Sequence, residues 1–85
     1  MRDPIARYPI SGTADKSVNL PERASYLVLY NDGSSNVTVT VGKSFSVTIA
    51  PGDFFDERLD PFDRIKITAT SPYRGYVRVP EGGNL

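Results

Sequence analysis

The sequence contains no cysteine, no histidine and no tryptophan among its 85 residues. Without cysteine there is no disulfide to supplement the modest core of so short a chain, as small secreted domains commonly require. This absence favours synthesis in the cytoplasm, or stability gained from partner subunits. Without histidine or cysteine, Ser-His-Asp catalysis, Cys-His catalysis and a structural zinc site are excluded. We therefore expect a protein that is not an enzyme and that uses no cofactor or metal.

Charge and hydropathy argue against two further kinds of partner. Ten basic residues balance ten acidic ones, so there is no net charge to attract nucleic acid or an anionic membrane. No apolar run approaches the ~20 residues that a transmembrane helix needs. Met1 to Tyr8 also lacks the continuous apolar stretch of a secretory signal. We expect neither nucleic acid nor a membrane as a partner.

The clearest pattern lies between Tyr26 and Ile49. Valine alternates with threonine over residues 36–41, and apolar residues alternate with serine and threonine over residues 45–49. A period of two places one set of side chains in a core and the other in water, as in a half-buried antiparallel sheet. Residues 25–30 are apolar on both faces, which is typical of a central strand or of a strand covered by another chain.

Turn residues separate the strand segments along the chain. Asp32-Gly33 suits a tight hairpin, and Pro51-Gly52 suits a type II turn. Pro21 is expected to end its strand or to hold it at an edge, because proline cannot donate to a ladder. Residues 54–59 could instead form one helical turn capped by Asp53, but so short a helix would be unstable, and we favour a strand. The expected strands are residues 17–20, 25–30, 36–41, 45–49, 54–59, 64–70 and 73–79.

The sum is an all-β fold, a compact antiparallel β-sandwich or small barrel of about seven strands over residues 17–79. Residues 1–16 contain proline and glycine without a sustained period, and we interpret them as an extended N-terminal arm. The arm is either a frayed terminus or a segment that becomes ordered on a neighbouring subunit. Residues 80–85 are expected to form a flexible C-terminal tail.

Three short motifs have both a chemical and a structural interpretation. Gly42-Lys43-Ser44 resembles the end of a phosphate-binding loop, but Val37 replaces the glycine that the motif needs, so a hairpin turn is favoured. The acids between Asp53 and Asp63 could attract calcium, yet their spacing matches no EF-hand, and pairing with Arg58 and Arg64 is the simpler expectation. Tyrosine and arginine interleave over residues 73–78, a pattern suited to stacking on single-stranded nucleic acid or to a protein interface.

The small core, the doubly apolar strand and the arm together favour a structural subunit that assembles with other protein chains and forms a homo-oligomer. The alternative is a carbohydrate- or receptor-binding module that uses exposed Tyr73, Tyr76, Phe54 or Phe62 as stacking platforms. The candidate partner-binding residues are the arm's charged and apolar side chains and four tyrosines: Arg2, Ile5, Arg7, Tyr8, Ile10, Tyr26, Tyr30, Tyr73 and Tyr76.

Three stretches carry a resemblance to a known group of proteins. They are Tyr-Leu-Val-Leu-Tyr-Asn-Asp-Gly from Tyr26, Ile-Ala-Pro-Gly-Asp from Ile49, and Asp-Pro-Phe-Asp-Arg-Ile-Lys-Ile from Asp60. In this order they resemble the small β modules of tailed-bacteriophage virions, over about two thirds of the chain. The resemblance implies a non-enzymatic virion component, such as a capsid decoration or cement protein or a tail or fibre part, made in the host cytoplasm. Its partners would be capsid or tail proteins, and no functional residue is implied.

Overall fold

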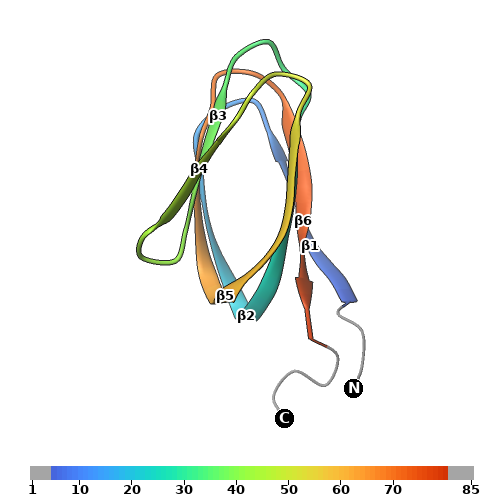
Figure 1. The fold of residues 1–85 in the computed structure, drawn as a ribbon, viewed down its shortest axis with the longest axis vertical. Coiled ribbons are helices and arrows are strands. Elements are labelled where there is room, and N and C mark those ends of the chain that lie inside the picture. The colour runs from blue at the N-terminus through green and yellow to red at the C-terminus, as the bar shows by residue number, and fades with distance from the viewer. Residues whose placement is uncertain (1–4, 81–85) are drawn as a thin grey trace.

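The computed structural model describes residues 5–80, which form six β-strands and no helix. All strand pairs are antiparallel, and they build a single sheet with the order β1-β6-β2-β5-β3-β4 (Figure 1). The predicted all-β class and antiparallel sheet are therefore confirmed. No helix in this part of the chain could cross a membrane. The strands are β1 (Ile5–Gly12), β2 (Lys16–Asn31), β3 (Val37–Val41), β4 (Phe45–Ile49), β5 (Phe54–Thr68) and β6 (Tyr73–Val79).

The two long strands β2 and β5 pair with each other along most of their length and curve together (Figure 1). Beyond the curve, β5 continues the sheet to β3 and β4, while β2 continues it to β6 and β1. The register between β2 and β5 shifts between Asn19 and Tyr26, where the strands bend. The sheet thus folds over itself and encloses a core between its two halves.

The structure has six strands where the sequence predicted about seven, because two pairs of predicted strands merge across the bend and β1 adds a strand that was not predicted. Residues 17–20 and 25–30 belong to β2, and the predicted strands 54–59 and 64–70 lie largely within β5. Pro21 and Pro61 do not end these strands, because both lie where the ladder register shifts and no regular N–H is required. The strand interpretation of residues 54–59 is confirmed, as is the 50–53 turn, in which the Asp53 amide donates to the Ala50 carbonyl at 3.0 Å.

The prediction that residues 1–16 stand apart from the domain is wrong for Ile5–Gly12, which pair with β6 as strand β1. Ile10 is only 4 % exposed and belongs to the core. The register shifts between Arg7 and Ile10, and Tyr8 has a φ of 55°, so an irregularity accommodates Pro9 within the strand. An extended chain next to an open strand edge gains ladder hydrogen bonds, and this pairing is not visible in a local pattern. Residues 1–4 and 81–85 lie outside the described residues, and with them Arg2 and most of the predicted tail.

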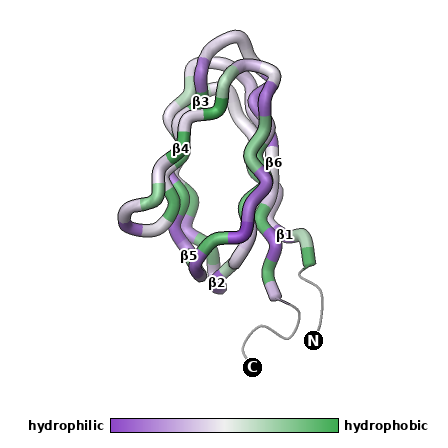
Figure 2. The backbone as a smooth tube through the Cα atoms, viewed as in Figure 1, coloured by the Kyte–Doolittle hydropathy of each residue, from purple (hydrophilic) through white to green (hydrophobic). Residues whose placement is uncertain are grey.

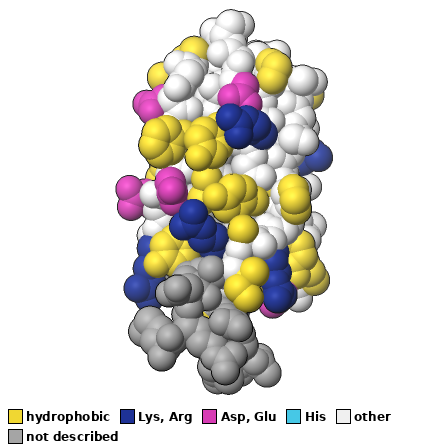
Figure 3. Space-filling view, turned by 90° about the vertical axis from the view of Figure 1, so that its right-hand side faces the viewer, with side chains coloured by type: hydrophobic (Ala, Val, Ile, Leu, Met, Phe, Trp, Pro, Cys, Tyr) yellow, Lys and Arg dark blue, Asp and Glu magenta, His cyan; other side chains and the backbone are white. Residues whose placement is uncertain are grey.

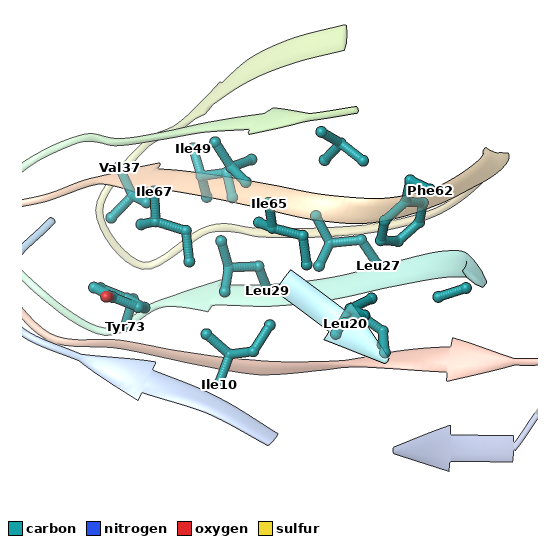
Figure 4. Packing of buried hydrophobic residues seen from close by; sticks show 14 of the residues in the cluster. Ile10, Leu20, Leu27, Leu29, Val37, Ile49, Phe62, Ile65, Ile67 and Tyr73 are labelled. Carbon is teal, nitrogen blue, oxygen red and sulfur yellow. The ribbon is translucent and has the colours of Figure 1, made fainter. Parts of the chain in front are cut away.

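The core consists of the inward side chains of both halves of the sheet. Figure 4 shows Leu27 and Leu29 of β2 facing Ile65 and Ile67 of β5, with Ile10 of β1 beside them. Hydrophobic and hydrophilic residues alternate along several strands in Figure 2. All three valines of β3 are buried, as the alternation predicted.

Two positions fix how the strands approach each other. A Cβ on Gly75 of β6 would lie 2.1 Å from the Val28 carbonyl oxygen and 2.9 Å from Leu29 Cα, so only glycine allows β6 this close to β2. Asn31, at the end of β2, is a polar residue buried to 1 % exposure. Its side-chain amide donates to the carbonyl oxygens of Ser35 and Ile49, both at 2.8 Å, and its side-chain oxygen accepts from the Gly33 amide at 3.0 Å. These bonds join the loop after β2 to the end of β4.

Candidate functional site

The outward side of β6, β2 and β5 carries aromatic and basic side chains in adjacent rows. Tyr26 is paired with Arg78, and Tyr30 is paired with Arg74 on one side and Phe54 on the other. Paired residues of an antiparallel sheet point to the same face, so the register itself gathers these side chains. We call this surface the aromatic–basic face, formed by Tyr26, Tyr30, Phe54, Arg74, Tyr76 and Arg78.

Val28 lies in the middle of this face and is nevertheless fully buried, at 0 % exposure. It is not part of the inner core cluster, because it alternates with Leu27 and Leu29 and points outward. Its ladder partners are Tyr76 and Asp56, and Tyr26 and Tyr30 flank it along β2 on the same face. Residues 25–30 of β2 are therefore apolar on both faces for two reasons. The strand is central in the sheet, which is one of the two interpretations given for its sequence, and the outer side chains cover Val28.

The Arg74 end of the face is held by three contacts. The Arg74 guanidinium carbon lies 4.5 Å from the centre of the Tyr30 ring, and its Nε donates to Asp32 Oδ2 at 2.7 Å. The rings of Tyr30 and Phe54 stack with centres 5.5 Å apart and planes 27° apart. Phe54 remains 56 % exposed, so this stack presents an apolar surface to solvent beside a positive charge.

The Arg78 end repeats the arrangement. Its guanidinium carbon lies 5.8 Å from the ring centres of both Tyr26 and Tyr76, and Nη2 donates to the Tyr76 hydroxyl at 3.4 Å. The hydrogen bond to Tyr76 raises the pKa of Arg78 above its ordinary value, against the effect of burial. Nη1 also lies 3.9 Å from Asp56 Oδ1. Asp56 therefore pairs with β6, and not with Arg58 or Arg64 as expected from the sequence.

Figure 3 shows the side of the molecule on which β6 and β1 lie, with hydrophobic side chains set among basic and acidic ones. Tyrosine and arginine are the residues enriched at the energetic centres of protein interfaces. Ring stacking and ion pairs hold these side chains before any partner arrives, which lowers the entropy lost on binding. The arrangement is suited to binding by stacking, charge and apolar contact.

Two adjoining hollows of about 420 and 510 Å³ lie where β5 bends, near the middle of the strand and away from Phe54 at its start. Arg58, Leu59, Asp60 and Pro61 line both of them. They bring together no pairing of a nucleophile with a histidine or cysteine, which the sequence lacks. Within residues 5–80, no three acidic side chains lie close enough to hold a metal ion, and the acids of β5 are spread along an extended strand.

The structure unites only some of the partner-binding residues expected from the sequence. Tyr26, Tyr30 and Tyr76 share the aromatic–basic face. Tyr73 and Ile10 are buried: Tyr73 is 2 % exposed, and its hydroxyl donates to the Ala14 carbonyl at 2.8 Å. Both are corrections, since these side chains fill the core where β1 meets β6.

Of the remaining predicted residues, Ile5, Arg7 and Tyr8 lie on β1, and Arg2 lies outside the described residues. Ile5 is exposed, and Arg7 and Tyr8 both donate to the Glu22 carboxylate of β2, so they hold β1 in place. The Tyr8 hydroxyl, followed by Arg7, lowers the pKa of Glu22, while Glu22 raises the pKa of Tyr8.

The sequence analysis considered Phe54 and the arginines of residues 73–78 as contact residues in separate hypotheses, but it did not place them on one face with Tyr26 and Tyr30 or find Val28 beneath them. The alternation along β6 was sufficient to place Arg74 and Arg78 with Tyr76. Phe54 required the register between β2 and β5, which no local pattern contains.

No protein-family model matches this chain, and neither a curated protein nor a solved structure is significantly similar to it.

Proposed function

We propose that this chain is a non-enzymatic structural subunit that docks on other protein subunits through its aromatic–basic face. The observation that carries the proposal is the ordered array of three tyrosines, one phenylalanine and two arginines that covers Val28. The proposed setting is the virion of a tailed bacteriophage, where the chain would act as a capsid decoration or cement protein after synthesis in the host cytoplasm. That setting rests on the sequence resemblance described above.

The charges of the face indicate what kind of partner it would accept. Asp32 and Asp56 lie beside Arg74 and Arg78, so the face is nearly balanced and attracts no polyanion as a whole. Phe54, which lies across Tyr30 from Arg74, offers exposed apolar area at the β5 side of the face. The matching partner surface is apolar, with a few acidic side chains that replace Asp32 and Asp56 as ion-pair partners of the arginines.

The face replaces the N-terminal segment as the proposed docking element. Ile10, one of the predicted anchors, is already buried inside the domain, and Arg7 and Tyr8 are bound to Glu22. The carbohydrate-binding alternative is weakened in a similar way, because two of its four stacking platforms, Tyr73 and Phe62, belong to the core.

A direct test compares particle occupancy of the wild-type chain with that of a Phe54→Ser/Arg74→Ser variant. Both side chains are exposed, so their loss should leave the fold intact. The matched control is Lys66→Ala/Thr68→Ala, two exposed positions of β5 outside the aromatic–basic face. Each chain is mixed with virus particles that are assembled from the same genome but lack this protein. Occupancy is measured by quantitative mass spectrometry of gradient-purified particles.

We expect wild type and control to be retained and the variant to lose at least tenfold in occupancy, about 1.4 kcal/mol of binding free energy. Absence of the wild-type chain from purified particles would refute the virion setting. Full occupancy by the variant would refute the role of the aromatic–basic face. Binding of the wild-type chain to a glycan array, lost in the same variant, would favour the carbohydrate alternative.

A further inference from the structure

The two outer edges of the sheet differ in how they are protected. Strand β1 at one edge carries Pro9, a positive φ at Tyr8, a register shift and the charged Arg7, all of which hinder pairing with another strand. Strand β4 at the other edge reads Phe-Ser-Val-Thr-Ile, with no charge, no proline and no glycine. It pairs with β3 over five residue pairs without a shift, and within residues 5–80 no strand pairs with its outer side.

The hydrogen-bond alternation shows which groups of β4 face outward. The Gly42 amide donates to the Arg64 carbonyl at 2.9 Å, so Gly42 faces β5, and Thr40 and Thr38 follow it at intervals of two. The odd-numbered residues of β3 then face β4, where their partners are Phe45, Val47 and Ile49. The backbone groups of Ser46 and Thr48 consequently point away from the sheet, toward the open edge.

We infer that the outer edge of β4 is a pairing site for β4 of a second copy of this chain. The strand is self-complementary when two copies meet antiparallel about a two-fold axis at Val47. In that register Phe45 lies opposite Ile49 of the second copy, Val47 opposite its equivalent, and Ser46 opposite Thr48. Each Ser46–Thr48 pair exchanges two backbone hydrogen bonds, about four in total, and hydroxyl-bearing and apolar side chains each meet their own kind.

Two further observations favour a second copy as the occupant. The same sequence of β4 already pairs with β3 in this manner, with valine opposite valine and threonine opposite threonine. Phe45 remains 40 % exposed at the start of the strand, and the pairing would set it against an isoleucine. Because β4 carries no charge, the two-fold axis brings no like charges together. Strand β4 lies at the opposite edge of the sheet from β1 and β6, so pairing there leaves the aromatic–basic face open at β6 (Figure 1).

The test uses two variants that differ only in the sign of one introduced charge. Ser46→Lys/Thr48→Lys sets lysine opposite lysine in both contacts of the dimer, while Ser46→Glu/Thr48→Lys sets glutamate opposite lysine. Both positions are exposed, and both variants lose the same hydroxyl contacts with Thr40 and Thr38, so this loss in the monomer is matched. Sedimentation equilibrium of the purified chain gives the dimer dissociation constant, and circular dichroism confirms that each variant is folded.

We expect the wild-type chain to dimerise, the double-lysine variant to dimerise at least tenfold more weakly, and the charge-paired variant to retain dimerisation. A wild-type chain that stays monomeric up to about 1 mM, the limit of weak specific association, overturns the inference. Equal dimerisation of the two variants overturns it as well. Particle occupancy is a separate measurement. A negative dimerisation result does not refute the docking role of the aromatic–basic face, and a negative occupancy result does not refute the dimer.

Discussion

Asn31 offers the sharpest test of how the fold is held together, because one buried side chain makes three hydrogen bonds to the backbone. Replacing it with leucine removes all three and leaves the Ile49 carbonyl without its side-chain donor in a buried site. A buried group that loses its partner costs about 1–3 kcal/mol, and the more exposed bonds to Gly33 and Ser35 add about 1 kcal/mol together. We expect Asn31→Leu to lower the free energy of unfolding by about 2–4 kcal/mol. That is a large share of the roughly 4–13 kcal/mol expected for a domain of this size.

Asn31→Asp adds a signed pH dependence to the same test. The carboxyl group keeps an acceptor for the Gly33 amide but places an oxygen where the amide donated to two carbonyl oxygens. The neutral carboxyl can still donate to one of them, so the pKa of this aspartate is raised in the folded chain. Its folding stability is then greatest below the ordinary pKa of aspartate and falls as the pH rises through the raised value.

Urea unfolding followed by circular dichroism at about pH 4.5 and pH 7.5 measures both effects, with Thr68→Ala at an exposed site as control. An Asn31→Asp variant as stable as wild type at the higher pH would refute the role assigned to the buried amide.

Three other perturbations test β1 and its neighbours. Ile10→Ala should cost about 2–4 kcal/mol in urea unfolding, since Ile10 is a core side chain and not an arm that anchors elsewhere. Gly75→Ala should cost about 1–3 kcal/mol, because its Cβ would overlap the Val28 carbonyl, and unchanged stability would contradict the close approach of β6 to β2. The lowered pKa of Glu22 means that its support of β1 is present above the ordinary glutamate pKa and lost as pH falls through the lowered one. The protection factors of the β1 amides, which correct for the pH dependence of intrinsic exchange, should therefore fall on acidification, and Glu22→Gln should remove that response.

The local patterns predicted what depends on neighbouring residues in the chain. The alternation in β3 placed its valines inside, and Pro51-Gly52 marked a real turn. Pro21 was interpreted too strictly, because it lies at a bend where a missing N–H costs nothing. The pairing of β1 with β6 joins segments more than 60 residues apart, and no local period contains that information.

The same distinction applies to the candidate site, where local alternation predicts some residues and cross-strand register is needed for others. Tyr26 and Tyr30 follow from alternation along one strand, and so would the inward direction of Tyr73, which alternates in step with Val77 and Val79. Phe54 joins the face only through the cross-strand register of β2 with β5. Alternation places Arg74 and Arg78 beside Tyr76, but only the structure shows that their guanidinium groups lie over the tyrosine rings.

The most direct test of the docking role is hydroxyl-radical footprinting of the free chain and of the chain within purified particles. Oxidation of Tyr30, Phe54 and Tyr76 is followed by mass spectrometry, because these rings lie on the aromatic–basic face. We predict that Phe54, the most exposed of them, is oxidised several-fold more slowly in the particle, together with the two tyrosines. Equal oxidation rates in the free and the assembled chain would contradict docking through this face.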